Sequence, residues 1–432
     1  MPSLLPLVRI ALLAGLFVIA PRLATAQEAG QQQEAQPTVQ ELQRRVDILA
    51  EEIDKLRSGE PQQEVSPERA RSLGLGTSAA SVYGRTRGVS IAGYGEMLYE
   101  NFARQNQAGT SVNQGTTLDF LRAVFYFGYR FDEKFLFNSE IELEHANEIS
   151  VEFAYIDYIA HPSLTVRGGM VLLPMGLTNE FHEPPAFLSA KRPETESRII
   201  PSTWRENGFG LVGSTGKFSY RAYVVNGLNA AGFTADGIRN GRQKGARAKA
   251  QDVAFAGRAD VTPTPGMMFG GSYYVGNSSQ DELTAGGQPI GVRTRIGEVH
   301  GLVQMRGIDV RGLYARTQID DAAGLNTALS LTGTAGVAEV MEGGYIQAGY
   351  NVLSHFTERA SLLPFYRFED INTQARMPAG FAANAASDRR YHTVGAQFLP
   401  IPSVTLKTDY QWIRNEANTG LSQFNIALGY NF

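Results

Sequence analysis

The chain has 432 residues, no cysteine, and 39 Lys and Arg against 43 Asp and Glu, for a net charge of −4. The lack of cysteine excludes a disulfide framework and any thiolate metal site, and the near balance of charge argues against a nucleic-acid-binding surface. One repeated pattern covers most of the length, which predicts a single large domain preceded by small N-terminal segments.

The first 26 residues are typical of a secretory signal peptide. Arg9 supplies a positive charge, residues 10–20 form a short apolar core, and Ala24-Thr25-Ala26 is a small-residue cleavage motif. We therefore expect the mature chain to begin at Gln27. Residues 27–37 are polar and rich in Gln, which predicts a flexible segment.

Residues 38–57 have the heptad pattern of a coiled coil. Apolar residues recur at alternating spacings of three and four: Val39, Leu42, Val46, Leu49, Ile53 and Leu56. About three heptads are too few for a stable isolated dimer or trimer. These helices would therefore associate beneath a trimeric barrel, lie singly on another surface, or tether the protein to the periplasmic envelope. Residues 58–87 contain Gly, Pro and Ser without periodicity and are expected to be a linker.

From residue 88 onward, apolar and polar residues alternate in about sixteen segments. In the last of them Phe424, Ile426, Leu428, Tyr430 and Phe432 share one face, opposite polar and small residues. This pattern favours an antiparallel β-barrel with lipid outside and water inside. The expected strands cover 89–102, 117–131, 134–145, 149–160, 163–173, 206–214, 217–227, 252–262, 266–276, 292–305, 307–318, 338–353, 359–371, 389–399, 403–414 and 421–432.

Most connections alternate between short turns and long loops, although 146–148 and 415–420 are short where a long loop would fall. Asp132-Glu133 and His161-Pro162 are examples of the short class, whereas 228–251 and 319–337 belong to the long class. Outer-membrane barrels have this asymmetry, with tight turns in the periplasm and long loops outside. An even number of strands would also bring both ends of the barrel to the periplasmic side.

The longest gap between strands, residues 174–205, is rich in Pro and aromatic residues, and we call it the constriction loop. We expect it to fold into the barrel and narrow the pore, the alternative being a cap outside the mouth. Sixteen strands leave room for water inside, and charged residues fall on the face opposite the aromatics. The candidate pore residues are Lys191, Arg192, Arg198, Arg205, Arg122, Arg167, Glu180 and Glu183.

Ion selectivity follows from the sign of the lumen charge. Many arginines fall on predicted inward faces and favour a weak preference for anions. Several carboxylates, among them Glu140, Glu142 and Asp157, are expected to face inward as well. A mixed lumen without such a preference is therefore the competing interpretation.

With strands, turns and loop in place, the chain resembles the phosphate-selective porin O/P family of Gram-negative outer membranes. The resemblance rests on the signal peptide, the heptads, the sixteen-strand count, and the stretches Val166-Arg167-Gly168-Gly169-Met170 and 198–208 (RIIPSTWRENG). It implies a homotrimeric porin in which the third loop folds inward, and phosphate-specific members use lysine clusters and arginine ladders. Here Lys191 and Arg192 are the only adjacent basic pair in the constriction loop.

The expected partners are outer-membrane lipid, small hydrophilic or anionic solutes, and possible periplasmic envelope components, with no nucleic acid and no cofactor. Two other classes of protein compete with the porin. A barrel enzyme has weak support, because Ser354-His355 lies in an expected turn. Glu180, His182 and Glu183 are a weak metal-binding pattern, so the sequence assigns no metal site. An envelope tether would act through the coiled coil.

Overall fold

The computed structural model describes residues 63–432 together with Arg44 and Asp47. The predicted signal peptide and flexible segment, the predicted coiled coil apart from Arg44 and Asp47, and the start of the predicted linker therefore lie outside the described residues. Among residues 63–432, no helix is both long and apolar enough to cross a membrane.

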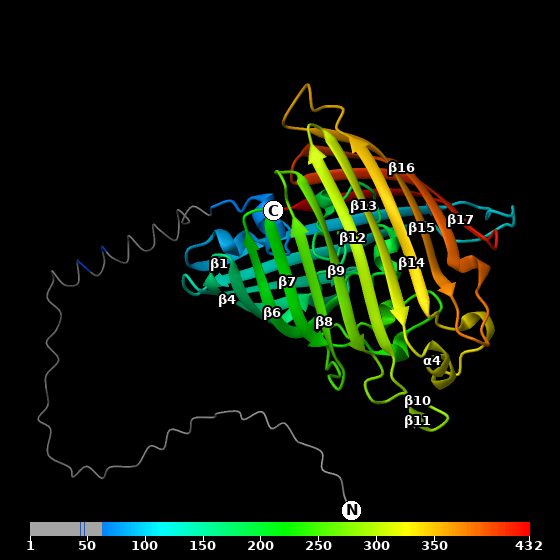
Figure 1. Ribbon diagram of the computed structural model, residues 1–432. Helices are drawn as coiled ribbons and strands as arrows, with labels where there is room; N and C mark the ends of the chain where they lie inside the picture. Colours follow the sequence, from blue (N-terminus) through cyan, green and yellow to red (C-terminus); the bar gives the residue numbers. More distant parts are fainter. Residues whose placement is uncertain (1–43, 45–46, 48–62) are drawn as a thin grey trace, which may run out of the picture. The chain divides into compact units, whose positions relative to one another are not determined.

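Sixteen antiparallel strands form one closed barrel, which confirms the predicted fold (Figure 1). Each strand pairs with its neighbours in the chain, and β1 closes the barrel against β18, with Tyr94 opposite Asn431. The strands are β1 (Gly88–Phe102), β2 (Thr117–Arg130), β3 (Phe135–Glu144), β4 (Glu148–His161), β5 (Leu164–Leu172), β6 (Arg205–Thr215), β7 (Phe218–Asn226), β8 (Val253–Val261), β9 (Met267–Asn277), β12 (Arg293–Met305), β13 (Ile308–Ile319), β14 (Val340–Tyr350), β15 (Ser361–Arg376), β16 (Asp388–Ile401), β17 (Val404–Asn415) and β18 (Gln423–Asn431).

The connections follow the predicted alternation of short and long. Between β12 and β13 the turn consists of Arg306 and Gly307, both with positive φ, as a tight two-residue hairpin turn requires. Two long loops carry the small sheet β10 (Thr284–Ala285) with β11 (Gln288–Pro289), and the helix α4 (Ala322–Ala328), at the same end of the barrel (Figure 1). The largest boundary difference is in β15, which extends to Arg376 rather than to 371.

The two faces of the wall have opposite character. Along single strands an exposed apolar residue stands beside a buried polar one, as in Val299 beside Glu298, Ile346 beside Gln347, and Trp412 beside Gln411. A charged side chain facing the bilayer midplane costs about 2–4 kcal/mol. The alternation therefore directs the polar residues into the lumen.

Residues 63–84 are ordered against the barrel, unlike the irregular linker expected for 58–87, and we call them the plug segment. The residues from Ala70 to Val82 are largely buried, whereas most of 63–69 are exposed. The segment contains α2 (Pro67–Ser72), which Ser66 caps by accepting a hydrogen bond from the Arg69 backbone, and the 3₁₀ helix η1 (Ser81–Gly84). Its Leu73, Leu75 and Val82 are buried. Apolar contacts and hydrogen bonds to the wall order this segment. These contacts are not reflected in any periodic pattern of the sequence.

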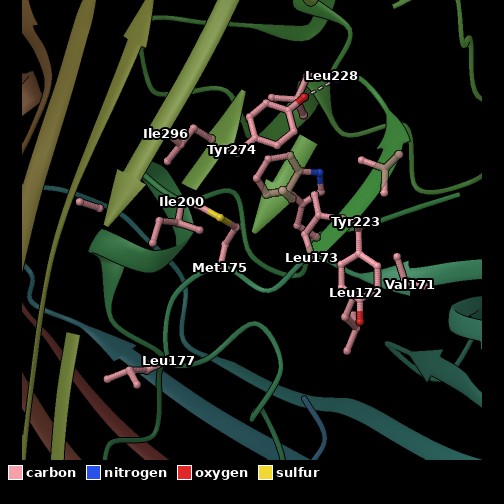
Figure 2. Close-up of a cluster of buried hydrophobic side chains, with 14 of the residues drawn as sticks. Val171, Leu172, Leu173, Met175, Leu177, Ile200, Tyr223, Leu228, Tyr274 and Ile296 are labelled. Atoms are coloured by element: carbon pink, nitrogen blue, oxygen red, sulfur yellow. Dashed lines mark hydrogen bonds between the residues drawn. The ribbon is translucent and has the colours of Figure 1, made fainter. Parts of the chain in front are cut away.

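The main apolar cluster lies between the constriction loop and the wall. Figure 2 shows Leu173 near Tyr223 of β7 and Met175 next to Ile200, and Leu177 and Tyr274 of β9 belong to the same cluster. The remaining short helices are η2 (Pro184–Ala186), α3 (Glu194–Arg198), η3 (Ala230–Gly232), η4 (Arg239–Gly241), η5 (Gly333–Ala335) and η6 (Ala385–Ser387).

Candidate functional site

The constriction loop makes its contacts with lumen-facing side chains on the far wall. The backbone N–H of Ala190 donates to Asp409 of β17 at 2.6 Å. Thr195 donates to Glu369 of β15 through its backbone N–H at 3.2 Å and its hydroxyl at 3.3 Å. All of these groups are buried. The loop therefore crosses the lumen from β5 to β15 and β17.

The adjacent cations of the loop differ in their partners. Lys191 Nζ lies 2.9 Å from a carboxylate oxygen of Glu100 on β1, with 31% of the lysine side chain exposed. Arg192 is half-buried, and its Nη2 has no hydrogen-bond partner among the described residues. This pair thus joins one ion-paired lysine and one arginine whose buried Nη2 makes no hydrogen bond among the described residues.

Arg198 and Arg205 frame the end of the loop. Arg198 pairs with Glu194 at 2.6 Å and also contacts Asp236 of the next long loop. Arg205 is the first residue of β6, and its guanidinium lies 3.0 Å from Glu152 of β4. Both cations are therefore held by carboxylates.

The two wall arginines are buried in ion pairs. Arg122 lies 2.9 Å from Glu142 and 3.6 Å from Glu96. Arg167 pairs with Asp157 at 2.8 Å, and one of its guanidinium nitrogens donates to the Leu73 carbonyl of the plug segment at 3.2 Å. Arg167 therefore links the wall to the plug segment.

The two loop carboxylates serve different contacts. Glu180 lies 3.0 Å from Arg221 and 3.6 Å from Arg258. Glu183 accepts hydrogen bonds from the backbone N–H groups of Ser78 and Ala79 at 3.0 and 3.2 Å. The plug segment and the constriction loop thus pack directly on each other.

A glycine in the plug segment makes this close packing possible. Gly74 has φ +73°, and a Cβ atom added there would lie 2.2 Å from a carboxylate oxygen of Glu180. A residue with a Cβ would be strained at this positive φ, and the Glu180 carboxylate would have to shift to make room for it.

The buried charges do not have a single sign. Among the described residues fourteen Asp and Glu side chains and eight Arg and Lys side chains are buried. Most are joined in ion pairs, so the lumen lacks an uninterrupted row of unpaired arginines. The buried part of the lumen is mixed, as in the competing interpretation of the sequence.

A basic cluster near the end of the constriction loop was not identified from the sequence; it is formed by Arg192, Arg205, Arg239, Arg242 and Lys244. Arg239, Arg242 and Lys244 of the loop between β7 and β8 approach Arg192 and Arg205 closely enough to repel them. Burial, together with these positive neighbours, lowers the pKa of Arg239 to about 10 and that of Arg242 to about 9. Both remain charged at neutral pH. The signal was available in the five basic residues spaced through 239–249.

The suggested metal residues are not brought together. His182 lies between Glu140 of β3 and Glu152 of β4, at 3.2 and 3.4 Å, whereas Glu180 and Glu183 point to the partners described above. His355 of the adjacent Ser-His pair hydrogen-bonds to the Tyr350 hydroxyl at 2.8 Å. The imidazole Nε2 of His355 is therefore bonded to a tyrosine hydroxyl rather than to Ser354.

One curated relative covers most of this chain. An uncharacterized protein of Aquifex aeolicus (strain VF5) is 37% identical over 363 residues, which cover 80% of each chain. No model of a protein family matches.

Solved structures show the fold alone, because their identities are low. The loop L8 deletion mutant of OmpT, an outer membrane protein of Vibrio cholerae, is 10% identical with a TM-score of 0.52, covering 81% of this chain and all of the other. In-vitro folded OmpT, described as a trimer form, gives 0.51 at 10% identity, with the same coverage. Salmonella typhi OmpF in complex with daunomycin gives 0.51 at 13% identity, covering 80% and 98%.

Proposed function

The chain belongs to the same family as the uncharacterized Aquifex aeolicus protein, and we propose that it forms a passive channel for small hydrophilic solutes in the outer membrane of a Gram-negative bacterium. One observation carries this proposal. A sixteen-strand barrel closes on itself with an apolar outer face and a charged inner face. Such a wall is suited to lipid outside and to a polar interior.

The path for solutes is narrow under this proposal. The constriction loop and the plug segment both occupy the lumen, and Glu183 joins them through hydrogen bonds, while Gly74 leaves room for Glu180. A narrow, charged passage excludes large solutes and favours small hydrated ones. A homotrimeric assembly belongs to the same proposal, supported by the trimer form of a protein that shares the fold.

A weak preference for anions, phosphate included, is the finer part of the proposal. Its support is the basic cluster formed by Arg192, Arg205, Arg239, Arg242 and Lys244, together with the resemblance to phosphate-selective porins. The acidic excess among buried groups opposes this field, which keeps the preference small.

The test is conductance and reversal potential in a planar bilayer, with a salt gradient. We expect discrete conductance steps and a reversal potential on the anion side. Lys191→Glu with Arg192→Glu reverses two positive charges in the constriction loop and should move the reversal potential toward cations.

The matched control is Lys249→Glu. Lys249 pairs with Glu282 across two outer loops, and both side chains are more than a third exposed. Its reversal should leave selectivity unchanged. A folded barrel without conductance would overturn the channel proposal and favour an enzyme or a tether. Unchanged selectivity in the double variant would remove Lys191 and Arg192 from the pore site.

A further inference from the structure

We infer that Glu140, Glu152 and His182 form a site for a divalent transition-metal ion of the zinc class, which joins the constriction loop to the barrel wall. His182 Nε2 lies 3.2 Å from a Glu140 oxygen and 3.4 Å from a Glu152 oxygen. In a tetrahedral zinc site with bonds of about 2.0–2.2 Å, ligand atoms stand about 3.3–3.5 Å apart. The two distances from His182 match this spacing, and the three ligand atoms all lie within 4.8 Å of one another.

The histidine is oriented for coordination. Its Nδ1 lies 2.9 Å from the backbone carbonyl oxygen of Asn179 in the same loop. A carbonyl accepts only, so Nδ1 carries the hydrogen, and in the neutral imidazole the Nε2 lone pair faces the two carboxylates. A metal-bound histidine commonly donates its second ring nitrogen to a carbonyl in this way.

An irregularity in the wall places the second carboxylate. The register between β3 and β4 shifts so that Glu140 pairs with Phe153 and Ile141 pairs with Val151. Glu152 is the extra residue of this β-bulge. The bulge lets Glu152 and Phe153 both point inward, where strict alternation would turn one of them toward lipid.

Unpartnered polar atoms mark the same spot. The second oxygen of Glu140 has no hydrogen-bond partner among the described residues. The Glu152 oxygen that faces His182 makes no hydrogen bond there either, and its contact with the imidazole is an ion-pair distance of 3.4 Å. Within the described part of the chain, a hydrogen-bond partner is also lacking for an oxygen of the neighbouring Glu142 and for the hydroxyl of Tyr94, whose ring centroid lies 6.0 Å from that of His182. All five side chains are at most 3% exposed. Buried polar atoms in native proteins are rarely left unpaired, so a bound ion accounts for this group.

The local charge has the sign for such an ion. Glu140 and Glu152 face His182, and Arg205 is the guanidinium paired with Glu152. With His182 neutral, two carboxylates in this group face one guanidinium, which leaves it negative. A bound cation is therefore attracted to the group.

The ligand set selects the class of metal. One imidazole and two carboxylates suit zinc and its transition-metal neighbours, whereas magnesium and calcium prefer oxygen ligands alone. Three protein ligands leave a fourth position for water or solute. The ion would fix the loop to β3 and β4, and this inference does not depend on whether the barrel conducts.

The test uses the untagged, full mature chain folded in detergent, stripped with chelator and titrated with zinc chloride by calorimetry. We expect one zinc ion per chain. X-ray absorption of the zinc-loaded protein should show one imidazole nitrogen with carboxylate oxygens in the first shell. His182→Ala and Glu140→Gln should each weaken binding by at least about tenfold.

His300→Gln is the matched control. His300 is also a buried histidine between two carboxylates, Glu298 and Asp260. Here the Arg258 guanidinium lies 2.9 Å from the imidazole Nε2, where a metal ion would otherwise bind, and already supplies a positive charge. This variant should bind zinc as the parent does. The inference is overturned if the parent chain binds no stoichiometric zinc, if its zinc shell lacks histidine, or if folded His182→Ala binds zinc normally.

Discussion

Replacing Arg167 by Met should destabilise the barrel strongly, because Arg167 neutralises a fully buried carboxylate. Asp157 has no exposed surface, and Arg167 donates to both of its oxygens at 2.8 and 3.0 Å. Arg167 also lies over the Tyr155 ring at 4.0 Å and donates to the plug segment at Tyr83 and Leu73. Removing one member of a buried pair costs about 3–5 kcal/mol.

The measurement is the rate of unfolding in denaturant, with the folded detergent-solubilised barrel followed by its gel mobility. If the whole loss appears in unfolding, the rate rises about 140- to 4000-fold, at about 1.4 kcal/mol per tenfold. The double variant Arg167→Met with Asp157→Asn removes the isolated charge and should recover a large part of the loss.

Arg390→Met is the surface control. Arg390 is half exposed and lies 3.4 Å from Asp370, which is equally exposed. Exposed pairs contribute about 0–1 kcal/mol. The reasoning fails if Arg167→Met unfolds no faster than Arg390→Met, or if the two changes at Arg167 and Asp157 simply add.

The two tryptophans report the two environments of the wall. Brominated lipid should quench the fluorescence of Trp412, which is exposed on the outer face, and should leave that of buried Trp204 unchanged. The measurement uses two variants, each with the other tryptophan replaced by Phe. The opposite pattern would contradict the assigned faces. Trp204→Ala should cost about 3–5 kcal/mol of stability, measured by denaturant unfolding, because the ring packs on Tyr274 at a centroid distance of 4.7 Å; an effect as small as that of Trp412→Ala would argue against this. Glu183→Ala removes the acceptor for Ser78 and should loosen the plug segment, raising single-channel conductance; an unchanged conductance would show that the contact does not limit flow.

Alternation at period two was sufficient to predict the strands, their number and their faces. In β18, Phe424 to Tyr430 alternate outward and inward as expected. The reason is that lipid and water act on each strand separately, so the preference for one face is recorded locally. The loop asymmetry was readable in the same way, since a tight hairpin such as Arg306-Gly307 depends only on its own residues.

The partners of the charged residues depended on the closed barrel. Arg167 and Glu183 were recognised as candidate pore residues, but their contacts with the plug segment join residues about a hundred positions apart. The plug segment itself has no period, because unique contacts with the wall order it rather than a repeated face.

The same holds for the cluster around His182. Its neighbours in sequence, Glu180 and Glu183, suggested a weak metal pattern, whereas the structure pairs it with Glu140 and Glu152. A one-residue bulge decides which way Glu152 points, and a strictly alternating pattern does not encode such a shift. Local solvent preference therefore determined the wall, and only closure of the sheet around the loop decided which charges meet inside it.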